Sequence, residues 1–244
     1  GDADLCHAPP GDRRPTEGQV MRPSSLVLVG LVRLLVGAYP RWVGCGPEAT
    51  QRIYFANHSS HIDTLAIWAA LPLDLRRRTR PVAARDYWGT GGIRSYIALK
   101  GLHAVLIERS REERTADPLA PLYEALSAGD SLIIFPEGTR RPPGSQPDYK
   151  PGFVALYEGL GLPCVPVALN SGLFWPRRSL MRYPGTIVIE ILEPIPPGLP
   201  RAQARAVIQE KIETACALLI AEARAKPNPP PLPEAAGKSV PVQG

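Results

Sequence analysis

The chain has 244 residues, of which 44% are hydrophobic and 21% are charged, and its formal net charge is +5. This length allows one domain with a substantial core and small appendages, and the composition excludes a fibrous or wholly disordered protein. The positive charge is compatible with nucleic acid, anionic lipid or a phosphorylated substrate as a partner. The four cysteines are far apart and form no CxxC or Cys/His cluster, which favours a reduced cytoplasmic setting without structural zinc.

Both ends of the chain are polar and rich in proline, and we expect flexible tails over residues 1–22 and 226–244. Residues 23–225 are expected to form a single domain. An apolar run at residues 25–38 is shorter than the ~20 residues that span a membrane, and it contains Arg33. We expect a helix over about 24–40 that lies in the membrane interface, with Tyr39 and Trp42 at the headgroup level. An ordinary core helix is the alternative.

From about residue 50, short β-rich runs alternate with stretches of helical periodicity. Strands are expected at residues 52–56, 81–84, 104–107, 131–135, 164–169 and 186–192. Helices are expected at residues 62–70, 93–99, 118–127, 153–159 and 202–225. The alternation predicts an α/β fold, in which helices flank a mixed, mostly parallel sheet.

His58 and Asp63 belong to the segment NHSSHID, which follows the first of these strands. Ser60 is the expected N-cap of the next helix, so Asp63 falls in the first helical turn and can meet His58. A carboxylate bonded to one imidazole nitrogen fixes the tautomer and leaves the other nitrogen free to deprotonate an alcohol. That alcohol could attack a thioester directly. A buried histidine bonded to a loop carbonyl is the alternative, and His61 is expected to cap the helix or line the entrance.

A second polar segment, FPEGTR at residues 135–140, ends the strand expected at residues 131–135. Pro136 stops the strand and Gly138 allows a tight turn, so Glu137 and Arg140 lie where α/β sheets usually form sites. A guanidinium binds phosphate oxygens in pairs, which suits Arg140 to a phosphate. Glu137 is expected to orient an acceptor hydroxyl or to position Arg140. An exposed turn with a surface ion pair is the alternative.

In this order, the two segments resemble the PlsC-type glycerolipid acyltransferase family, whose members carry an N-H-x4-D block and a later F-P-E-G-T-R block. Three more segments resemble blocks of that family: Ile107-Glu108-Arg109, Lys150-Pro151-Gly152 and Val165-Pro166-Val167. The resemblance covers about residues 21–225. It departs at Glu108, where aspartate is common, and at Arg141, where a small residue is common.

The resemblance implies acyl transfer from a thioester, acyl-CoA or acyl-carrier protein, to a lysophospholipid hydroxyl, with no metal or cofactor. It implies that His58 is the general base and that Asp63 is its partner. The residues implied in acceptor binding are Arg109, Glu137, Gly138, Thr139, Arg140 and Lys150. Because three of them are basic, 1-acylglycerol-3-phosphate is the favoured acceptor and phosphatidic acid the product. Another lysolipid as acceptor, or a non-catalytic membrane-binding module, stays an alternative.

Further basic residues bear on the location of the protein. Five arginines follow the helix expected at residues 62–70: Arg76, Arg77, Arg78, Arg80 and Arg85. Near an anionic leaflet each basic residue contributes about 1 kcal/mol, and no aromatic residue lies among them for stacking on bases. We therefore expect a peripheral or monotopic protein at the cytoplasmic face of the cell membrane, with a phospholipid surface and no nucleic acid as partner. A solvated basic face is the alternative.

Overall fold

The structure is a computed structural model that describes residues 37–85, 101–108, 119–145, 148–177 and 182–232, and the single positions Gly30, Gly92, Tyr96, Leu99 and Asp117. Its strands are β1 (Tyr39–Trp42), β2 (Ile53–Ala56), β3 (Thr79–Ala84), β4 (Val105–Ile107), β5 (Ser131–Ile134), β6 (Cys164–Leu169) and β7 (Val188–Ile191). Its helices include α2 (Asp63–Ala70), α3 (Leu73–Arg77), α6 (Ala120–Ser127), α7 (Gly152–Leu160), α8 (Ser171–Phe174) and α9 (Arg201–Arg224).

The strands form one sheet in the order β1-β7-β6-β2-β5-β3-β4. All neighbouring strands are parallel except β6 and β7, which run antiparallel. β2 lies between β5 and β6, and all four of its residues are buried, as is typical of a parallel strand covered on both faces. The predicted fold, a mixed and mostly parallel sheet flanked by helices, is therefore confirmed.

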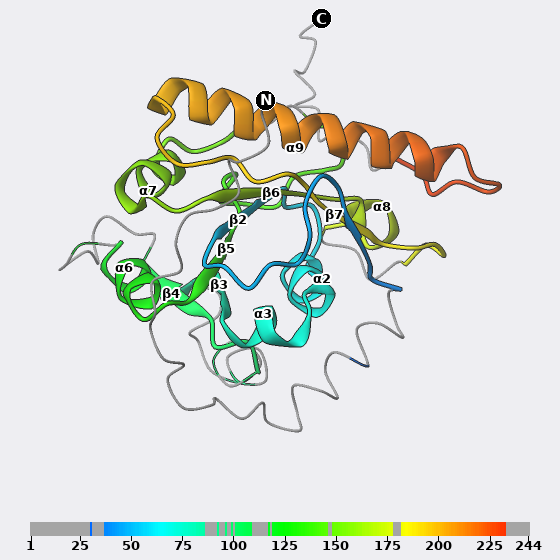
Figure 1. Cartoon of the computed structure of the whole chain (residues 1–244). Coiled ribbons are helices and arrows are strands. Elements are labelled where there is room, and N and C mark those ends of the chain that lie inside the picture. Colours follow the sequence, from blue (N-terminus) through cyan, green and yellow to red (C-terminus); the bar gives the residue numbers. More distant parts are fainter. Residues whose placement is uncertain are drawn as a thin grey trace, which may run out of the picture.

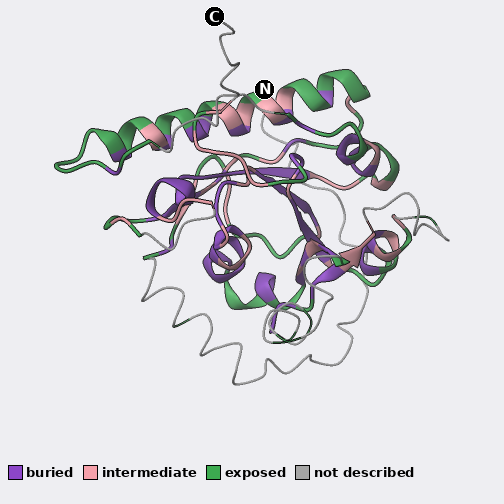
Figure 2. Cartoon of the chain, turned by 180° about the vertical axis from the view of Figure 1, so that it is seen from behind, coloured by how far each residue is buried: buried purple, intermediate pink, exposed green. Residues whose placement is uncertain are grey.

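The two faces of the sheet have separate hydrophobic cores, because successive side chains of a strand point to opposite faces. Tyr54 belongs to the core that includes residues of α2, whereas Ile53 and Phe55 belong to the core that includes residues of α6, α7 and α9. Figure 1 shows α9 running along one face, with α2 and α3 on the other. The inward side of α9 is buried and its outer side is exposed (Figure 2).

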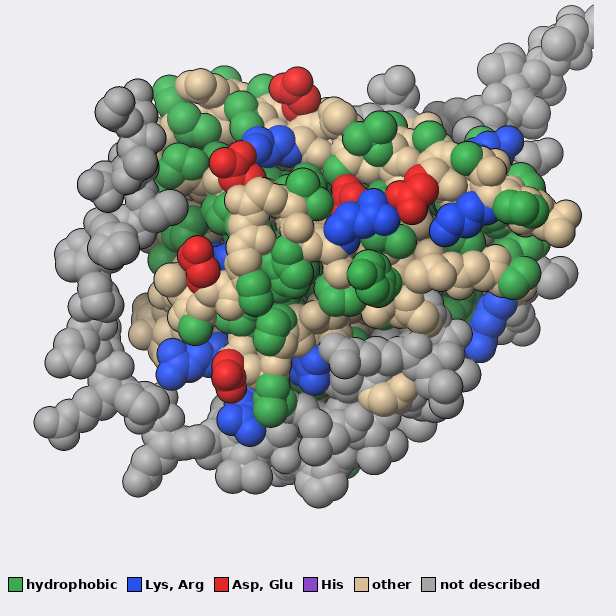
Figure 3. All heavy atoms as spheres, turned by 45° about the vertical axis from the view of Figure 1, so that its right-hand side comes forward, with side chains coloured by type: hydrophobic (Ala, Val, Ile, Leu, Met, Phe, Trp, Pro, Cys, Tyr) green, Lys and Arg blue, Asp and Glu red, His purple; other side chains and the backbone are tan. Residues whose placement is uncertain are grey.

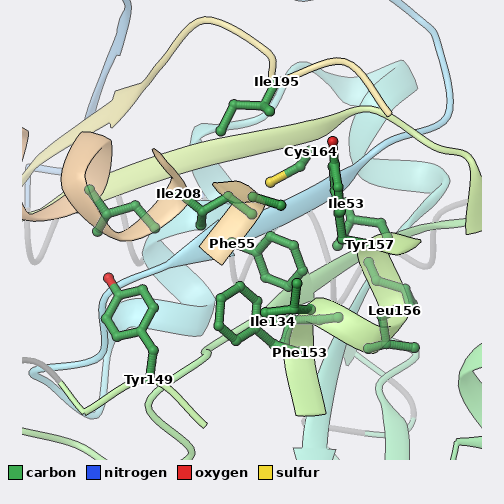
Figure 4. Packing of buried hydrophobic residues seen from close by; sticks show 14 of the residues in the cluster. Ile53, Phe55, Ile134, Tyr149, Phe153, Leu156, Tyr157, Cys164, Ile195 and Ile208 are labelled. Atoms are coloured by element: carbon green, nitrogen blue, oxygen red, sulfur yellow. The ribbon is translucent and has the colours of Figure 1, made fainter. Parts of the chain in front are cut away.

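The core beneath α7 and α9 is rich in aromatic rings. The rings of Phe55 and Phe153 meet edge to face with their centroids 5.1 Å apart, and Tyr149 meets Phe153 in the same way at 5.8 Å. Figure 4 shows these rings below Ile208 of α9 and beside Ile134 of β5. Edge-to-face pairs add to the stability that burial of their area already gives. This packing fixes β2 and β5 relative to each other, and the site lies just beyond the ends of these strands.

All six predicted strands are present within two residues of their expected ends, as are four of the five predicted helices. The fifth, at residues 93–99, falls largely outside the described residues. Most of the expected interfacial helix at 24–40 also lies outside them, as do the predicted tail at 1–22 and residues 233–244 of the tail predicted at 226–244. No helix within the described part of the chain combines the length and the apolar character needed to cross a membrane.

The end of the expected interfacial helix is wrong, because Tyr39–Trp42 form strand β1. Within the described residues this strand pairs only with β7, at the edge of the sheet, where Pro40 is tolerated although it has no amide hydrogen to donate. Trp42 is partly buried and packs against the core that includes residues of α2, and its expected place at the headgroup level stays a prediction. Arg41 links the strand to β7 and α9 through two ion pairs, because its Nη1 lies 2.9 Å from Glu190 Oε1 and 3.0 Å from Glu222 Oε2.

The expected membrane-facing cluster of five arginines is also wrong as a single surface feature. Arg76 is buried, and its guanidinium donates to the backbone oxygens of Trp68, Ala69 and Leu71 at the end of α2. Arg80 forms an ion pair with Asp130, and Arg85 forms an ion pair with Glu108. On the face seen in Figure 3, most described basic side chains lie beside acidic ones. Arg76 is therefore not part of a basic surface, whereas Arg77, Arg78 and Arg85 are exposed, and their contact with lipid stays a prediction.

Candidate active site

Three neighbouring strands end at the same edge of the sheet and carry the polar groups of the candidate site. β2, β5 and β6 are parallel, so their carboxyl ends meet, and this edge is where α/β sheets form their sites. His58 follows β2, Glu137 follows β5, and Ser171 follows β6. The side-chain amide of Asn57 holds two of these ends together, since it donates to Leu169 O (2.9 Å) and accepts from Leu169 N (2.8 Å).

His58 and Asp63 meet as the sequence predicts. His58 Nδ1 lies 2.8 Å from Asp63 Oδ2, although the two residues are five positions apart. Asp63 is completely buried, whereas the His58 side chain remains 19% exposed. Since the ionised carboxylate only accepts, Nδ1 carries the proton and Nε2 keeps its lone pair for another group.

The Asp63 carboxylate lies at the first residue of α2 and closes the turn before it. Its Oδ2 also accepts the backbone N–H groups of Ser59 (2.7 Å) and Ser60 (2.8 Å), while its Oδ1 accepts from the Ser171 hydroxyl. Ile62 occupies the N-cap position and Ser60 does not cap through its side chain, so the expected N-cap is wrong. Asp63 instead closes the loop before the helix, because the two N–H groups that its carboxylate accepts belong to residues 59 and 60.

The His58 ring is fixed in its plane by a second contact. It stacks on the Phe135 ring, with centroids 4.1 Å apart and an angle of 19° between the planes. The backbone of the same residue is held at both ends, because His58 N donates to Glu137 Oε1 (2.8 Å) and His58 O accepts from Arg141 N (2.7 Å). Glu137 of the FPEGTR segment and the next residue after that segment, Arg141, thus hold the loop that contains His58.

Glu137 is buried beneath this loop, with 4% of its surface exposed. Burial raises the pKa of its carboxyl to about 7, an effect that the hydrogen bond from His58 N partly offsets. Arg141 Nε lies 3.7 Å from Glu137 Oε2, which is a long ion pair. The expected partners of Glu137 were an acceptor hydroxyl and Arg140. In the structure its carboxyl bonds to the backbone of His58 instead, and its role in acceptor binding stays a prediction.

The other FPEGTR residues lie on the turn that follows β5. Gly138 has a φ of +66°, a conformation that L side chains rarely adopt, and Thr139 is exposed on the same turn. The Arg140 guanidinium contacts the ring of His61, and its backbone oxygen accepts from Arg177 Nη1 at 2.6 Å. His61 thus lies beside Arg140, and its expected place at an entrance stays a prediction.

Lys150 lies on the outer flank of this turn and is exposed. Its Nζ is 2.6 Å from Asp148 Oδ2, and Arg141 Nη2 lies 2.8 Å from the same oxygen. Its backbone N–H donates to Pro136 O (2.9 Å), which ties the Lys-Pro-Gly block to the FPEG turn. The two basic groups and Asp148 form a charged cluster beside the site, and a phosphate at Lys150 would compete with that carboxylate.

Arg109 lies outside the described residues, so its predicted role stays a prediction. The preceding strand β4 is the outer strand of the sheet and is separated from β2 by β5 and β3. At about 4.8 Å per strand, β4 ends about 14 Å from β2. Glu108, at the end of β4, pairs with Arg85.

Sequence reasoning missed two contributors to the site, Ser171 and Asn57. Ser171 begins α8 directly after a fully buried strand and is itself fully buried. The available signal was the run Asn170-Ser171-Gly172, three small or polar residues at the carboxyl end of a strand in an α/β sheet. Asn57 stood in the N-H-x4-D block, but its backbone clamp on Leu169 needs the pairing of β2 with β6 to be known.

The site can therefore move one proton at His58 Nε2 and hold the resulting imidazolium through Asp63. No group of three or more His, Cys, Asp or Glu side chains within the described residues is placed to hold a metal ion. Cys45, Cys164 and Cys216 are free thiols, and burial raises the pKa of Cys164 and Cys216 well above the usual value. Neither buried thiol is an activated nucleophile.

Comparisons with known proteins show which family the chain belongs to. A 1-acyl-sn-glycerol-3-phosphate acyltransferase of Pseudomonas aeruginosa is 40% identical over 95 residues, covering 38% of this chain and 37% of that protein. The human 1-acyl-sn-glycerol-3-phosphate acyltransferase alpha is 27% identical over 154 residues, covering 62% of this chain and 52% of its own. The match thus spans about a third to a half of the length of these relatives.

The fold also matches a solved structure. The crystal structure of PlsC, the 1-acyl-sn-glycerophosphate (LPA) acyltransferase from Thermotoga maritima, superimposes with a TM-score of 0.63 at 22% identity, covering 83% of this chain and 81% of that one. Residues 46–170 match the family described as Acyltransferase. This range includes both polar segments and makes up just over half of the sequence. The chain therefore belongs to the acyltransferase family, as its motifs predicted.

Proposed function

We propose that this protein transfers a fatty acyl group from acyl-CoA or acyl-carrier protein to the free hydroxyl of 1-acylglycerol-3-phosphate, giving phosphatidic acid. The observation that carries the proposal is the pair of His58 and Asp63, with Nδ1 and Oδ2 2.8 Å apart at the carboxyl ends of the central strands. The names of the similar proteins support lysophosphatidic acid as the acceptor.

In the reaction, His58 Nε2 takes the proton of the acceptor hydroxyl as its oxygen attacks the thioester carbonyl carbon. The carbon–sulfur bond of the tetrahedral intermediate then breaks, and the imidazolium returns the proton to the departing sulfur. The products are a new ester and the free thiol of the carrier. Asp63 stabilises the imidazolium throughout, as a carboxylate does beside a catalytic histidine. The chemistry uses no cofactor.

Arg140 and Lys150 would bind the acceptor phosphate, together with Arg109. In the structure Arg140 lies beside His61, and His61 is three residues after the base His58. A phosphate bound at Arg140 would therefore lie near the reacting hydroxyl. Gly138 and Thr139 would shape the turn against the glycerol.

The protein would work at the cytoplasmic face of the cell membrane as a peripheral or monotopic protein, because its acceptor and product are membrane lipids. The apolar run at residues 25–38, which precedes β1, supports attachment there. Flotation with vesicles of anionic phospholipid measures it: the full chain is expected to rise with the vesicles. Protein that stays at the bottom of the gradient at every salt concentration would rule out this location.

The decisive experiment is a matrix of donors and acceptors on one detergent-purified preparation. Acyl-CoA and acyl-carrier protein are each combined with lysophosphatidic acid and with lysolipids that carry a head group, and the diacyl product is measured. Product from lysophosphatidic acid alone supports the proposal, and product from another lysolipid alone replaces the acceptor. No product from any pair would leave the non-catalytic alternative.

A matched pair of histidine variants tests the base. His58→Ala is expected to lower kcat by about 10²- to 10⁴-fold, the usual contribution of a general base. His103→Asn is the control, since His103 precedes β4 and has a positive φ that asparagine tolerates. Full activity in His58→Ala would refute the mechanism while leaving the acyltransferase class intact.

A further inference from the structure

Ser171 lies one position beyond the range that matches the family, yet its hydroxyl reaches the carboxylate of the catalytic pair. It is completely buried at the start of α8. Resting on the proposed function, we propose that Ser171 is a positioning residue for that reaction, which holds the Asp63 carboxylate in the orientation that fixes the His58 tautomer.

The direction of the hydrogen bonds follows from the chemistry of the groups. An ionised Asp63 only accepts, so the single hydroxyl proton of Ser171 points at Oδ1. Ser59 Oγ, 3.3 Å from Ser171 Oγ, must then be the donor in that pair. The lone pair of Ser59 Oγ in turn accepts from the backbone N–H of Gly172 at 3.1 Å. A directed chain therefore runs from the Gly172 amide through two serine hydroxyls to Asp63.

The two oxygens of Asp63 have different tasks, and this difference explains the need for Ser171. Oδ2 accepts from His58 Nδ1 and from two backbone N–H groups, all within 2.8 Å. These three donors come from one loop, residues 58–60, and they would follow any movement of that loop. Ser171 comes from a different strand end and bonds to the other oxygen, so it prevents the carboxylate from rotating about its own axis.

The close approach that makes this contact possible is built into the neighbouring residue. A Cβ atom at Gly172 would lie 2.7 Å from both Cβ and Oγ of Ser59 and 2.8 Å from Pro143 Cγ, distances that real Cβ atoms essentially never show. Only glycine therefore lets the start of α8 press against the loop that carries His58. Asn170 secures the same turn from the other side, because its Oδ1 accepts from Val188 N at 2.9 Å.

The matched control for Ser171→Ala is Ser131→Ala. Ser131 is also a buried serine, and its Oγ accepts a hydrogen bond from Arg52 N, but it begins β5 at the opposite edge of the sheet from the site. Both variants lose one buried hydroxyl and are expected to lose similar stability. Only Ser171→Ala is expected to lower kcat, by about 10- to 100-fold, with the KM of both substrates unchanged, since one hydrogen bond to a charged group is lost. Ser171→Thr restores a hydroxyl and is expected to recover most of the loss.

A spectroscopic readout separates this proposal from the proposed function, because it needs no turnover. In protein labelled with ¹⁵N-histidine, the ring nitrogens of His58, assigned by their absence in His58→Gln, report which nitrogen carries the proton. The wild type and Ser131→Ala are expected to show one tautomer with the proton on Nδ1, and Ser171→Ala a mixture. If wild type transfers no acyl group, the proposed function fails and the ring shifts still decide the role of Ser171. Unchanged ring shifts in Ser171→Ala, or a kcat within twofold of the control, would overturn the proposal.

Discussion

Glu137 carries the strongest pH-dependent stability expected in the described part of the site. Its pKa lies near 7 in the folded protein and near the ordinary 4.5 in the unfolded chain, because burial disfavours the carboxylate. Between these values the native state binds a proton that the unfolded state has released. The contribution of Glu137 to wild-type stability therefore falls as the pH rises from 4.5 to 7, and it is lost above about pH 7.

The perturbation that isolates this effect is Glu137→Gln. The amide cannot ionise, and its oxygen can still accept the hydrogen bond from His58 N. The difference of 2.5 pH units corresponds to about 3 kcal/mol, at 1.36 kcal/mol for each unit. The variant is thus expected to gain up to about 3 kcal/mol relative to wild type between pH 4.5 and pH 8.

Urea unfolding of both proteins at half-unit steps from pH 4.5 to pH 8 measures the gain. Other titrating groups act equally on both proteins, so the difference between the two stability curves belongs to position 137. Glu210→Gln, on the exposed side of α9, is the control for the loss of one carboxylate from the surface. A flat difference between Glu137→Gln and wild type, or one that falls with pH, would refute the reasoning.

Three further substitutions test the packing around the site. Arg76→Met removes the donor for three buried carbonyl oxygens at the end of α2, so it is expected to lower the free energy of unfolding by about 2–4 kcal/mol. An unchanged urea midpoint would contradict this expectation. Arg41→Gln removes ion pairs whose members are 38% exposed for Arg41 and 43% for Glu222, and its effect should stay below about 1 kcal/mol in the same assay. Gly172→Ala is expected to lower the free energy of unfolding by about 1–3 kcal/mol and to lower kcat, because the added Cβ would displace Ser59. Wild-type values of both quantities would show that the turn adapts.

The fold was predictable because its strands are short apolar runs with clear ends. The strand at Ile53–Ala56 is followed by a polar segment, and that at Ser131–Ile134 is stopped by Pro136. Strand β1 was missed because Pro40 and Arg41 argue against a regular element, and only the pairing with β7 makes an edge strand of it. Tertiary pairing overrode the local signal there.

The core of the site was predictable from two motifs, whereas its supports were not. His58 and Asp63 are five residues apart, so local chain reversal is enough to bring them together. The buried state of Glu137 depends on the packing of β2 beside β5, and the contact of Ser171 depends on β2 beside β6. Strand order cannot be obtained from spacing in one sequence. Arg76 was misplaced for a different reason: its carbonyl partners are only five to eight residues away, but the guanidinium reaches them only because α3 folds back on the end of α2.

The three strand ends at the site are distant in the chain. The bond from His58 N to Glu137 spans 79 positions, that from Ser171 to Asp63 spans 108, and the clamp of Asn57 on Leu169 spans 112. Each contact requires closure of a long loop, and the entropy cost of that closure must be offset before the contact contributes to stability. No contiguous piece of the chain shorter than residues 57–171 contains all of these groups. Catalytic geometry is therefore a property of the assembled sheet, and enzyme activity in a refolding experiment should return together with the last strand pairing.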